Sequence, residues 1–158
     1  TAAQVGSRSS PGKEQQDIAR NALTRLQIEH LADHPYGLCS GGEKQLCLLA
    51  RAIAQQAKIL VMDEPSASLD FGNRIRVMQT VRGLVADGYA VVQTTHEPDQ
   101  AYLYSDKILA LHDGQVLAWG IPKDVMKASL MSTLYGISVE VHSMHDDRVR
   151  VCLPAQSI

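Results

Sequence analysis

The stretch KILVMD, Lys58–Asp63, is a short apolar run that ends in an acid and is followed directly by Glu64. Runs of this length are typical of a strand that is buried on both faces of a sheet. A second such run, YAVVQTTH (Tyr89–His96), follows the turn residues Asp87 and Gly88. We therefore predict two buried strands, each of which ends in polar residues.

Helical patterns surround these two strands. Between them, the segment 71–86 places apolar residues at helical spacing on one side: Ile75, Met78, Val81, Leu84 and Val85. Before the first strand, we expect one helix from Pro11 to about His30, with Ser10 as its N-cap, and another from Gly41 or Gly42 to about Gln56. The alternation of helices and strands predicts an α/β sandwich with a mainly parallel sheet.

Shorter elements are predicted after the second strand. A helix begins at Glu97-Pro98-Asp99, and Asp113-Gly114 is the turn signal of a hairpin. The remaining elements are short helices within 122–135 and two alternating strands near 139–141 and 149–153.

The amino-acid composition argues against several classes of function. The 158 residues suffice for one domain with a hydrophobic core, and 15 Lys and Arg against 17 Asp and Glu give a formal net charge of -2. That balance argues against a nucleic-acid partner, which would favour a basic surface. The first 16 residues lack the apolar core of a secretory leader, and no apolar run is long enough to span a membrane. Three cysteines without metal-ligand spacing indicate reduced thiols in a cytosolic protein.

The ends of the two strands carry the first candidate site residues. Ligands bind outside the carboxyl ends of parallel strands, where Asp63 can reach a metal and Glu64 can activate water. His96 ends the second strand in the same way. The alternatives are an acidic turn at DEP and a structural histidine.

The stretch CSGGEKQ carries the second candidate site. Ser40, Gly41 and Gly42 open a helix, where backbone amides and the helix dipole favour an anion such as a phosphate. The alternative is an ordinary N-cap at Ser40 that Glu43 completes as a capping box. Asp70, in SASLD, can likewise be a helix cap.

The order CSGGEKQ, ILVMDEP, SLD and TTH resembles the second half of an ABC-type ATPase. These stretches match the signature motif, the Walker B strand, the D-loop and the switch histidine of that family. The stretches LADHPY, LDFGNRIRV and TTHEPDQAYLYSDKILALHDGQVLAWG are most similar to importers of iron-siderophore, cobalamin, haem or molybdate type. Cys39 stands where leucine is usual in the family, and Glu43 where glutamine is frequent.

The resemblance implies a role for each candidate residue. Asp63 would bind Mg²⁺ through water, Glu64 would be the general base, and His96 would contact the γ-phosphate of ATP. Ser40, Gly41 and Gly42, with Glu43 beside them, would complete the ATP site of a second ATPase subunit. Asp70 would couple the two sites across the dimer.

The resemblance also implies an architecture. We expect a P-loop NTPase-type α/β core that lacks its Walker A strand. Residues 1–57 would be part of the helical subdomain, residues 58–136 the catalytic core, and residues 137–158 a C-terminal strand pair. A membrane permease would be the partner, so the protein would lie at the cytoplasmic face of the cell membrane.

The P-loop pattern G-x-x-x-x-G-K-[ST] is missing from this sequence. The nearest stretch, Gly6–Glu14, has one residue too many between its glycines, Glu14 in place of Ser or Thr, and Pro11, which removes an amide. We reject it and expect an upstream segment to supply the P-loop. The chain alone would then not hydrolyse ATP.

Four other interpretations of the sequence compete with this one. A DFG at residues 70–72 lacks the other kinase motifs. His142 and His145 are candidate metal ligands, but an exposed polar hairpin turn explains these residues better. Two alternatives for function stay open: a non-enzymatic half-protein that binds a partner ATPase or permease, and a soluble ABC ATPase outside transport.

Overall fold

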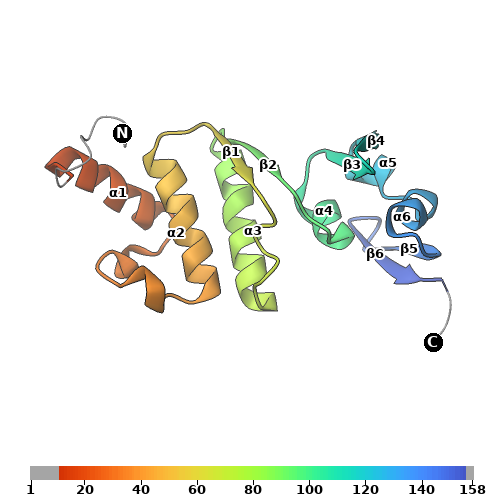
Figure 1. The fold of residues 1–158 in the computed structure, drawn as a ribbon, viewed down its shortest axis with the longest axis horizontal. Helices are drawn as coiled ribbons and strands as arrows, with labels where there is room; N and C mark the ends of the chain where they lie inside the picture. Colours follow the sequence, from red (N-terminus) through yellow and green to blue (C-terminus); the bar gives the residue numbers. More distant parts are fainter. Residues whose placement is uncertain (1–10, 156–158) are drawn as a thin grey trace. The chain divides into compact units, whose positions relative to one another are not determined.

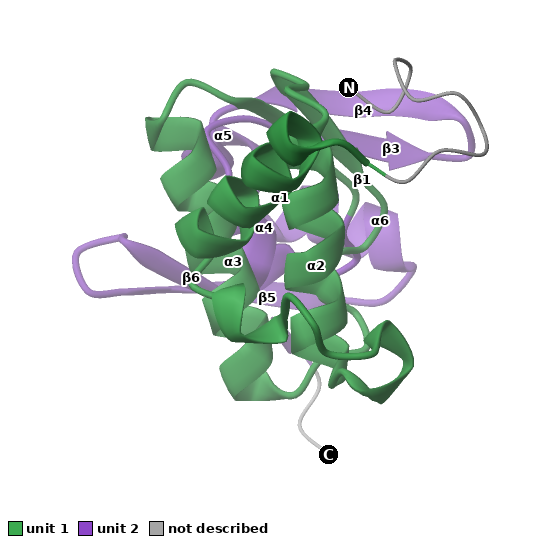
Figure 2. Ribbon diagram, turned by 90° about the vertical axis from the view of Figure 1, so that its left-hand side faces the viewer, with its two compact units in different colours: residues 1–94 green, residues 95–158 purple. Residues whose placement is uncertain are grey.

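The computed structural model describes residues 11–155 and divides after Thr94 into two compact units (Figure 2). We describe each unit by itself. The predicted boundaries at residues 57/58 and 136/137 stay predictions. The stretch Gly6–Glu14, rejected as a P-loop, lies largely outside the described residues.

The first unit combines helices with one pair of parallel strands (Figure 1). Its elements are α1 (Lys13–Arg25), η2 (Glu29–Leu31), η3 (Tyr36–Leu38), α2 (Gly41–Ala54), β1 (Ile59–Met62), α3 (Phe71–Ala86) and β2 (Ala90–Gln93). The predicted helices at the positions of α2 and α3 are confirmed. The first helix is shorter than predicted, because Gln27 adopts a φ of 58°, which an α-helix does not allow. Its N-cap is Gly12, and Ser10 is outside the described residues.

One face of the β1–β2 pair packs against helices of the first unit, and the side chains on the other face are exposed. Leu60 on β1 is 4% exposed and belongs to the core that includes Leu46 of α2 and Val81 of α3. On the opposite face Val61 is 79% exposed and Val92 is 58% exposed. Within the first unit the prediction of strands buried on both faces is therefore wrong, because the helices of this unit cover only one side of the pair.

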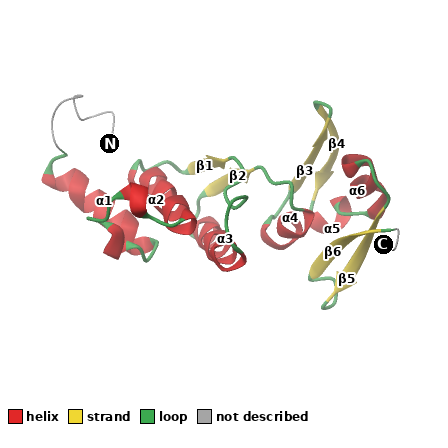
Figure 3. Cartoon of the chain, turned by 60° about the horizontal axis from the view of Figure 1, so that its bottom comes forward, coloured by secondary structure: helices red, strands yellow, loops and turns green. Residues whose placement is uncertain are grey.

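The second unit consists of short helices and two antiparallel hairpins (Figure 3). Its elements are α4 (Pro98–Tyr104), β3 (Ile108–His112), β4 (Gln115–Gly120), α5 (Pro122–Val125), α6 (Ala128–Tyr135), β5 (Val139–Met144) and β6 (Val149–Pro154). Asp113 and Gly114 have φ values of 48° and 73°, as a tight hairpin turn requires, so this prediction is confirmed. The described strands do not form a mainly parallel sheet. The strands of the second unit pair through β3–β4 and β5–β6, and the turns within these hairpins are so short that they join only antiparallel neighbours.

An arginine ties the last hairpin to the helices of its unit. Arg150 donates to both carboxylate oxygens of Asp147 (2.7 and 2.9 Å) and to the carbonyls of Lys123 and Met126 (both 2.8 Å). Its guanidinium also lies 5.2 Å from the ring centre of Tyr102 on α4. Hydrogen bonds from Arg150, then from Lys123 and Ser143, hold the pKa of Asp147 well below its ordinary value.

The cysteines and the apolar character of the helices were also considered in the sequence. Cys39, Cys47 and Cys152 are free thiols. Over residues 11–155, none of the helices combines the length and the apolar character that crossing a membrane needs.

Core packing on α2 gives a first prediction. Leu46 is 2% exposed and Leu48, on the same helix, is 39% exposed. We expect Leu46→Ala to lower the free energy of unfolding by about 2 to 5 kcal/mol, because it leaves a cavity among α1, α2 and α3. The matched control Leu48→Ala should cost less than about 1 kcal/mol. Urea unfolding followed by circular dichroism measures both, and equal losses would contradict the packing described here.

Acid stability tests the Asp147–Arg150 pair. Because the pKa of Asp147 is lower in the folded chain, its carboxylate stabilises the fold above the unfolded-state pKa of about 4. That contribution is lost as the pH falls below this value. Asp147→Asn should therefore be less stable at pH 7 and lose less stability between pH 4 and pH 2 than the parent chain. Urea unfolding across this pH range, with the exposed neighbour Asp146→Asn as control, tests it; parallel pH profiles for parent and Asp147→Asn would refute it.

Candidate functional site

The two acids lie at the carboxyl end of β1, beside the end of β2. The parallel register pairs Met62 with Gln93 and continues through a bond from the Thr94 amide to the Met62 carbonyl (3.0 Å). This register places Thr94 next to Asp63 and Glu64. The Thr94 hydroxyl donates to Asp63 Oδ1 and accepts from the Glu64 amide at 3.0 Å.

Glu64 adopts a left-handed backbone conformation, with a φ of 40°. Such a conformation is costly for a residue with a side chain, and it often marks functional sites. The bond from the Glu64 amide to Thr94 helps to hold it. The Asp63 and Glu64 side chains are both exposed, so they are accessible to a ligand.

Thr94 is the site residue that our sequence reasoning missed. It stands in the TTH stretch, of which only His96 was singled out. The signal was present, because parallel pairing of two strands that end at Asp63 and Thr94 places these side chains side by side. Using it requires the register, which neither strand specifies by itself.

The Ser-Gly-Gly stretch forms the start of α2 as predicted. Ser40 is the N-cap: its hydroxyl accepts from the Glu43 amide (3.3 Å), and the Glu43 carboxylate accepts from the Ser40 amide (2.7 Å). The capping box is therefore present. The bonds from the Ser40 amide and hydroxyl lower the pKa of Glu43, which favours its charged form.

Asp70 caps α3 close to the start of α2. Its carboxylate accepts from the amide and side chain of Asn73 (2.9 and 2.7 Å), which lowers the pKa of Asp70. Asn73 also faces Gly42: a Cβ on this glycine would lie 2.6 Å from Asn73 Oδ1 and 2.9 Å from Asn73 Cβ. Only glycine permits this approach, so Gly42 is needed for packing whatever its role in binding.

His96 belongs to the second unit, in the segment between β2 and α4. It is exposed, and its carbonyl accepts a hydrogen bond from the Tyr135 hydroxyl (3.0 Å). The structure therefore brings Asp63 and Glu64 together with Thr94. It separately brings the start of α2 to Asp70, and His96 is described within its own unit.

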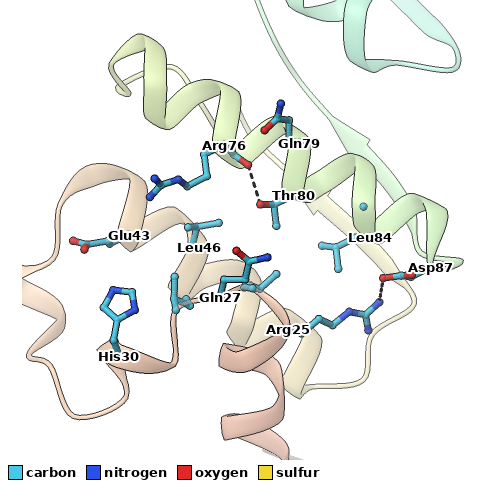
Figure 4. Close-up of a pocket in the computed structure, with 13 residues that line it drawn as sticks. Arg25, Gln27, His30, Glu43, Leu46, Arg76, Gln79, Thr80, Leu84 and Asp87 are labelled. Atoms are coloured by element: carbon cyan, nitrogen blue, oxygen red, sulfur yellow. Dashed lines mark hydrogen bonds and ion pairs between the residues drawn. The ribbon is translucent and has the colours of Figure 1, made fainter.

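Two open pockets lie in the first unit. The larger, about 520 Å³, is lined by residues of α1, α2 and α3, with Glu43 and His30 toward one end and the Arg25–Asp87 ion pair toward the other (Figure 4). The smaller, about 380 Å³, lies between α2 and β1 and includes Asp63. Size does not identify the site here, because the larger pocket contains neither strand-end acid.

Metal ligands are sparse in this arrangement. Residues 11–155 contain no group of three His, Cys, Asp or Glu side chains placed to hold a metal. His142 lies on β5 and contacts Glu140 at 3.0 Å, and His145 lies in the hairpin turn. Asp63 offers a hard, exposed carboxylate. Such a carboxylate fits Mg²⁺, which is commonly held by one or two carboxylates together with substrate phosphates and water.

Comparison with known proteins identifies the family. The family model described as ABC transporter matches residues 2–67. Over 136 residues the chain is 43% identical to an uncharacterized ABC transporter ATP-binding protein of Haemophilus influenzae, covering 86% of this chain and 52% of the relative. The chain belongs to the ABC transporter ATP-binding family.

Other ABC relatives have named transport roles. A hemin import ATP-binding protein of Thermobifida fusca is 34% identical over 88% of this chain and 49% of its own length. The ferric enterobactin transport ATP-binding protein of Escherichia coli is 32% identical over 79% of this chain and 46% of its own. This chain thus spans about half the length of the curated relatives it matches.

Solved ABC structures share the fold. An ABC transporter assigned to the metal-chelate type, in an inward-facing conformation, matches with a TM-score of 0.88 at 25% identity over 98% of this chain and 62% of that one. An ATP-binding cassette of another ABC transporter matches with a TM-score of 0.74 at 27% identity over 82% and 53%. The mixed α/β fold expected of this family is therefore confirmed.

The contact between Gly42 and Asn73 gives a third prediction. Gly42→Ala should lower the free energy of unfolding by about 1 to 3 kcal/mol, because its Cβ overlaps the Asn73 side chain. Adding Asn73→Gly removes every side-chain atom from the overlap, so the double variant should be no less stable than Asn73→Gly alone. Thermal unfolding of the four members of this cycle measures the coupling. Additive losses would show that the two residues are not in contact.

Proposed function

We propose that this chain supplies the signature and water-activating parts of an ATPase that drives import of a metal chelate or haem-like solute. The relatives named for hemin import and ferric enterobactin transport support this substrate class. The structural neighbour of metal-chelate type supports it as well. A membrane permease would carry the solute, and the ATPase would bind to it at the cytoplasmic face of the cell membrane.

The observation that carries the proposal is the hydrogen-bonded set at the end of β1 and β2. Thr94 fixes the side chain of Asp63 and the backbone of Glu64 with one hydroxyl. One carboxylate and the backbone of the next acid are thereby held at a strand-end edge, where nucleotide ligands bind in parallel sheets. Glu64 would take the proton of the attacking water, and Asp63 would meet the metal.

Mg²⁺ and ATP are the cofactors of this proposal. Asp63 would hold the metal together with the phosphates, and Mg²⁺ would supply positive charge that stabilises the phosphoryl oxygens. His96 is exposed at the start of the second unit. Its imidazole would contact the γ-phosphate of ATP and orient it for attack.

The start of α2 serves the ATP site of a second subunit. Ser40, Gly41 and Gly42 present the first amides of a helix of 14 residues, and the helix dipole favours an anion there. Asp70, which caps α3 beside this helix start, would couple the two sites across the dimer. A P-loop segment upstream of this chain would hold the triphosphate of each site.

Replacement of the general base tests this function. In an ATPase that contains this chain together with a P-loop, Glu64→Gln should lower kcat by about 10² to 10⁴-fold, because the amide cannot take a proton from water. Binding of ATP should persist, since Glu64 acts on water and does not hold the phosphates. Steady-state phosphate release measures kcat, and equilibrium binding of labelled ATP measures affinity.

Glu29→Gln is the matched control, because Glu29 is an exposed glutamate of the same unit. It should leave hydrolysis unchanged. Equal rates for the parent protein and Glu64→Gln would overturn the assignment of Glu64. A complex of the parent chain with a partner ATPase or permease that never hydrolyses ATP would instead favour the non-enzymatic alternative.

A further inference from the structure

The carbonyl of His96 is held by a tyrosine from far along the chain. The Tyr135 hydroxyl donates to this carbonyl at 3.0 Å, across 39 residues of sequence. Tyr135 is the last residue of α6, and Gly136, with a φ of 66°, ends the helix immediately after it. Tyr135 is 44% exposed, and its partial burial, followed by the nearby Cys152 and Asp99, raises its pKa. A tyrosine hydroxyl keeps its proton at neutral pH even without such a shift.

Hydrogen bonds also fix the residues on both sides of His96. The Thr95 hydroxyl donates to the side-chain oxygen of Gln100 (3.1 Å) and accepts from the Glu97 amide (3.1 Å). Gln100 lies on α4 and is only 5% exposed, so packing restricts the movement of its side chain. The segment is thus held from α4 at its flanks and from α6 at His96 itself.

The hairpin of β5 and β6 fixes these two helices in turn. The Cys152 amide donates to the Asp99 carboxylate of α4 (3.1 Å), and the Val139 amide donates to the Ser132 hydroxyl of α6 (2.9 Å). Tyr102 of α4 donates to the Asp147 carbonyl in the hairpin turn (2.6 Å). The helix that presents Tyr135 is therefore supported by the last strands of the chain.

We propose that Tyr135 is a positioning residue for His96: its hydroxyl fixes the backbone from which the imidazole reaches the γ-phosphate. This inference rests on the proposed function, in which His96 contacts that phosphate. Catalytic geometry is sensitive to displacement, since an error of about 1 Å can cost about 100-fold in rate. The Tyr135 hydroxyl matters because it donates to the His96 carbonyl. A phenylalanine at this position keeps the ring and removes only that bond.

A direct test uses this chain with ¹³C at the His96 carbonyl. Tyr135→Phe keeps the ring and removes the donor, so the ¹³C chemical shift of that carbonyl should move. Thr133→Val, which removes a hydroxyl bond of the same helix to the Ser129 carbonyl without touching His96, should leave it unchanged. An unmoved signal in Tyr135→Phe would overturn the proposal before any activity is measured.

A kinetic test uses the ATPase that contains both this chain and a P-loop. Tyr135→Phe should lower kcat by about 10- to 100-fold with a much smaller change in KM for ATP, because the misplaced group acts on the reacting phosphate. Thr133→Val should leave kcat near the parent value. In a His96→Ala background, Tyr135→Phe should have no further effect on kcat, since it acts through His96.

The outcomes separate this inference from the function on which it rests. If His96→Ala leaves kcat unchanged, the assigned role of His96 fails. If His96→Ala lowers kcat and Tyr135→Phe does not, only the role of Tyr135 fails. Effects of the two substitutions that multiply would show a general structural role for Tyr135 and would also overturn the proposal.

Discussion

The parallel pairing of β1 with β2 is the constraint on which the candidate site depends. Its register extends beyond the strands through the bond between Thr94 and the Met62 carbonyl. The same register lets one threonine hydroxyl reach the side chain of Asp63 and the amide of Glu64. A shift by one residue would turn Thr94 to the other face of the pair and remove both bonds. Packing of Leu60 against α2 and α3 opposes such a shift.

Local signals in the sequence were sufficient for most elements and for the capping of helices. Ser40 with Glu43, and Asp70, were recognisable as helix starts because a cap acts within three residues. The Asp113-Gly114 hairpin was predictable for the same reason, since a turn depends on its own backbone angles. The candidate acids were recognised from their place after a strand.

Properties that depend on distant residues were not predictable in this way. Val61 and Val92 have apolar side chains of the kind found in buried strands, yet they are exposed, because no element of the first unit packs on their face of the pair. The role of Thr94 required the register, and the contact of Gly42 with Asn73 required the packing of α2 beside α3. The bond from Tyr135 to His96 joins residues whose sequence separation hides any relation.

We propose that this chain holds one part of a composite ATP site whose phosphate-binding loop lies on another segment. Calorimetric titration of this chain with Mg-ATP, alone and after addition of a P-loop segment of the same family, tests it most directly. We expect no saturable heat for the chain alone and stoichiometric binding once the P-loop segment is present. Stoichiometric binding of Mg-ATP by the chain alone would contradict it.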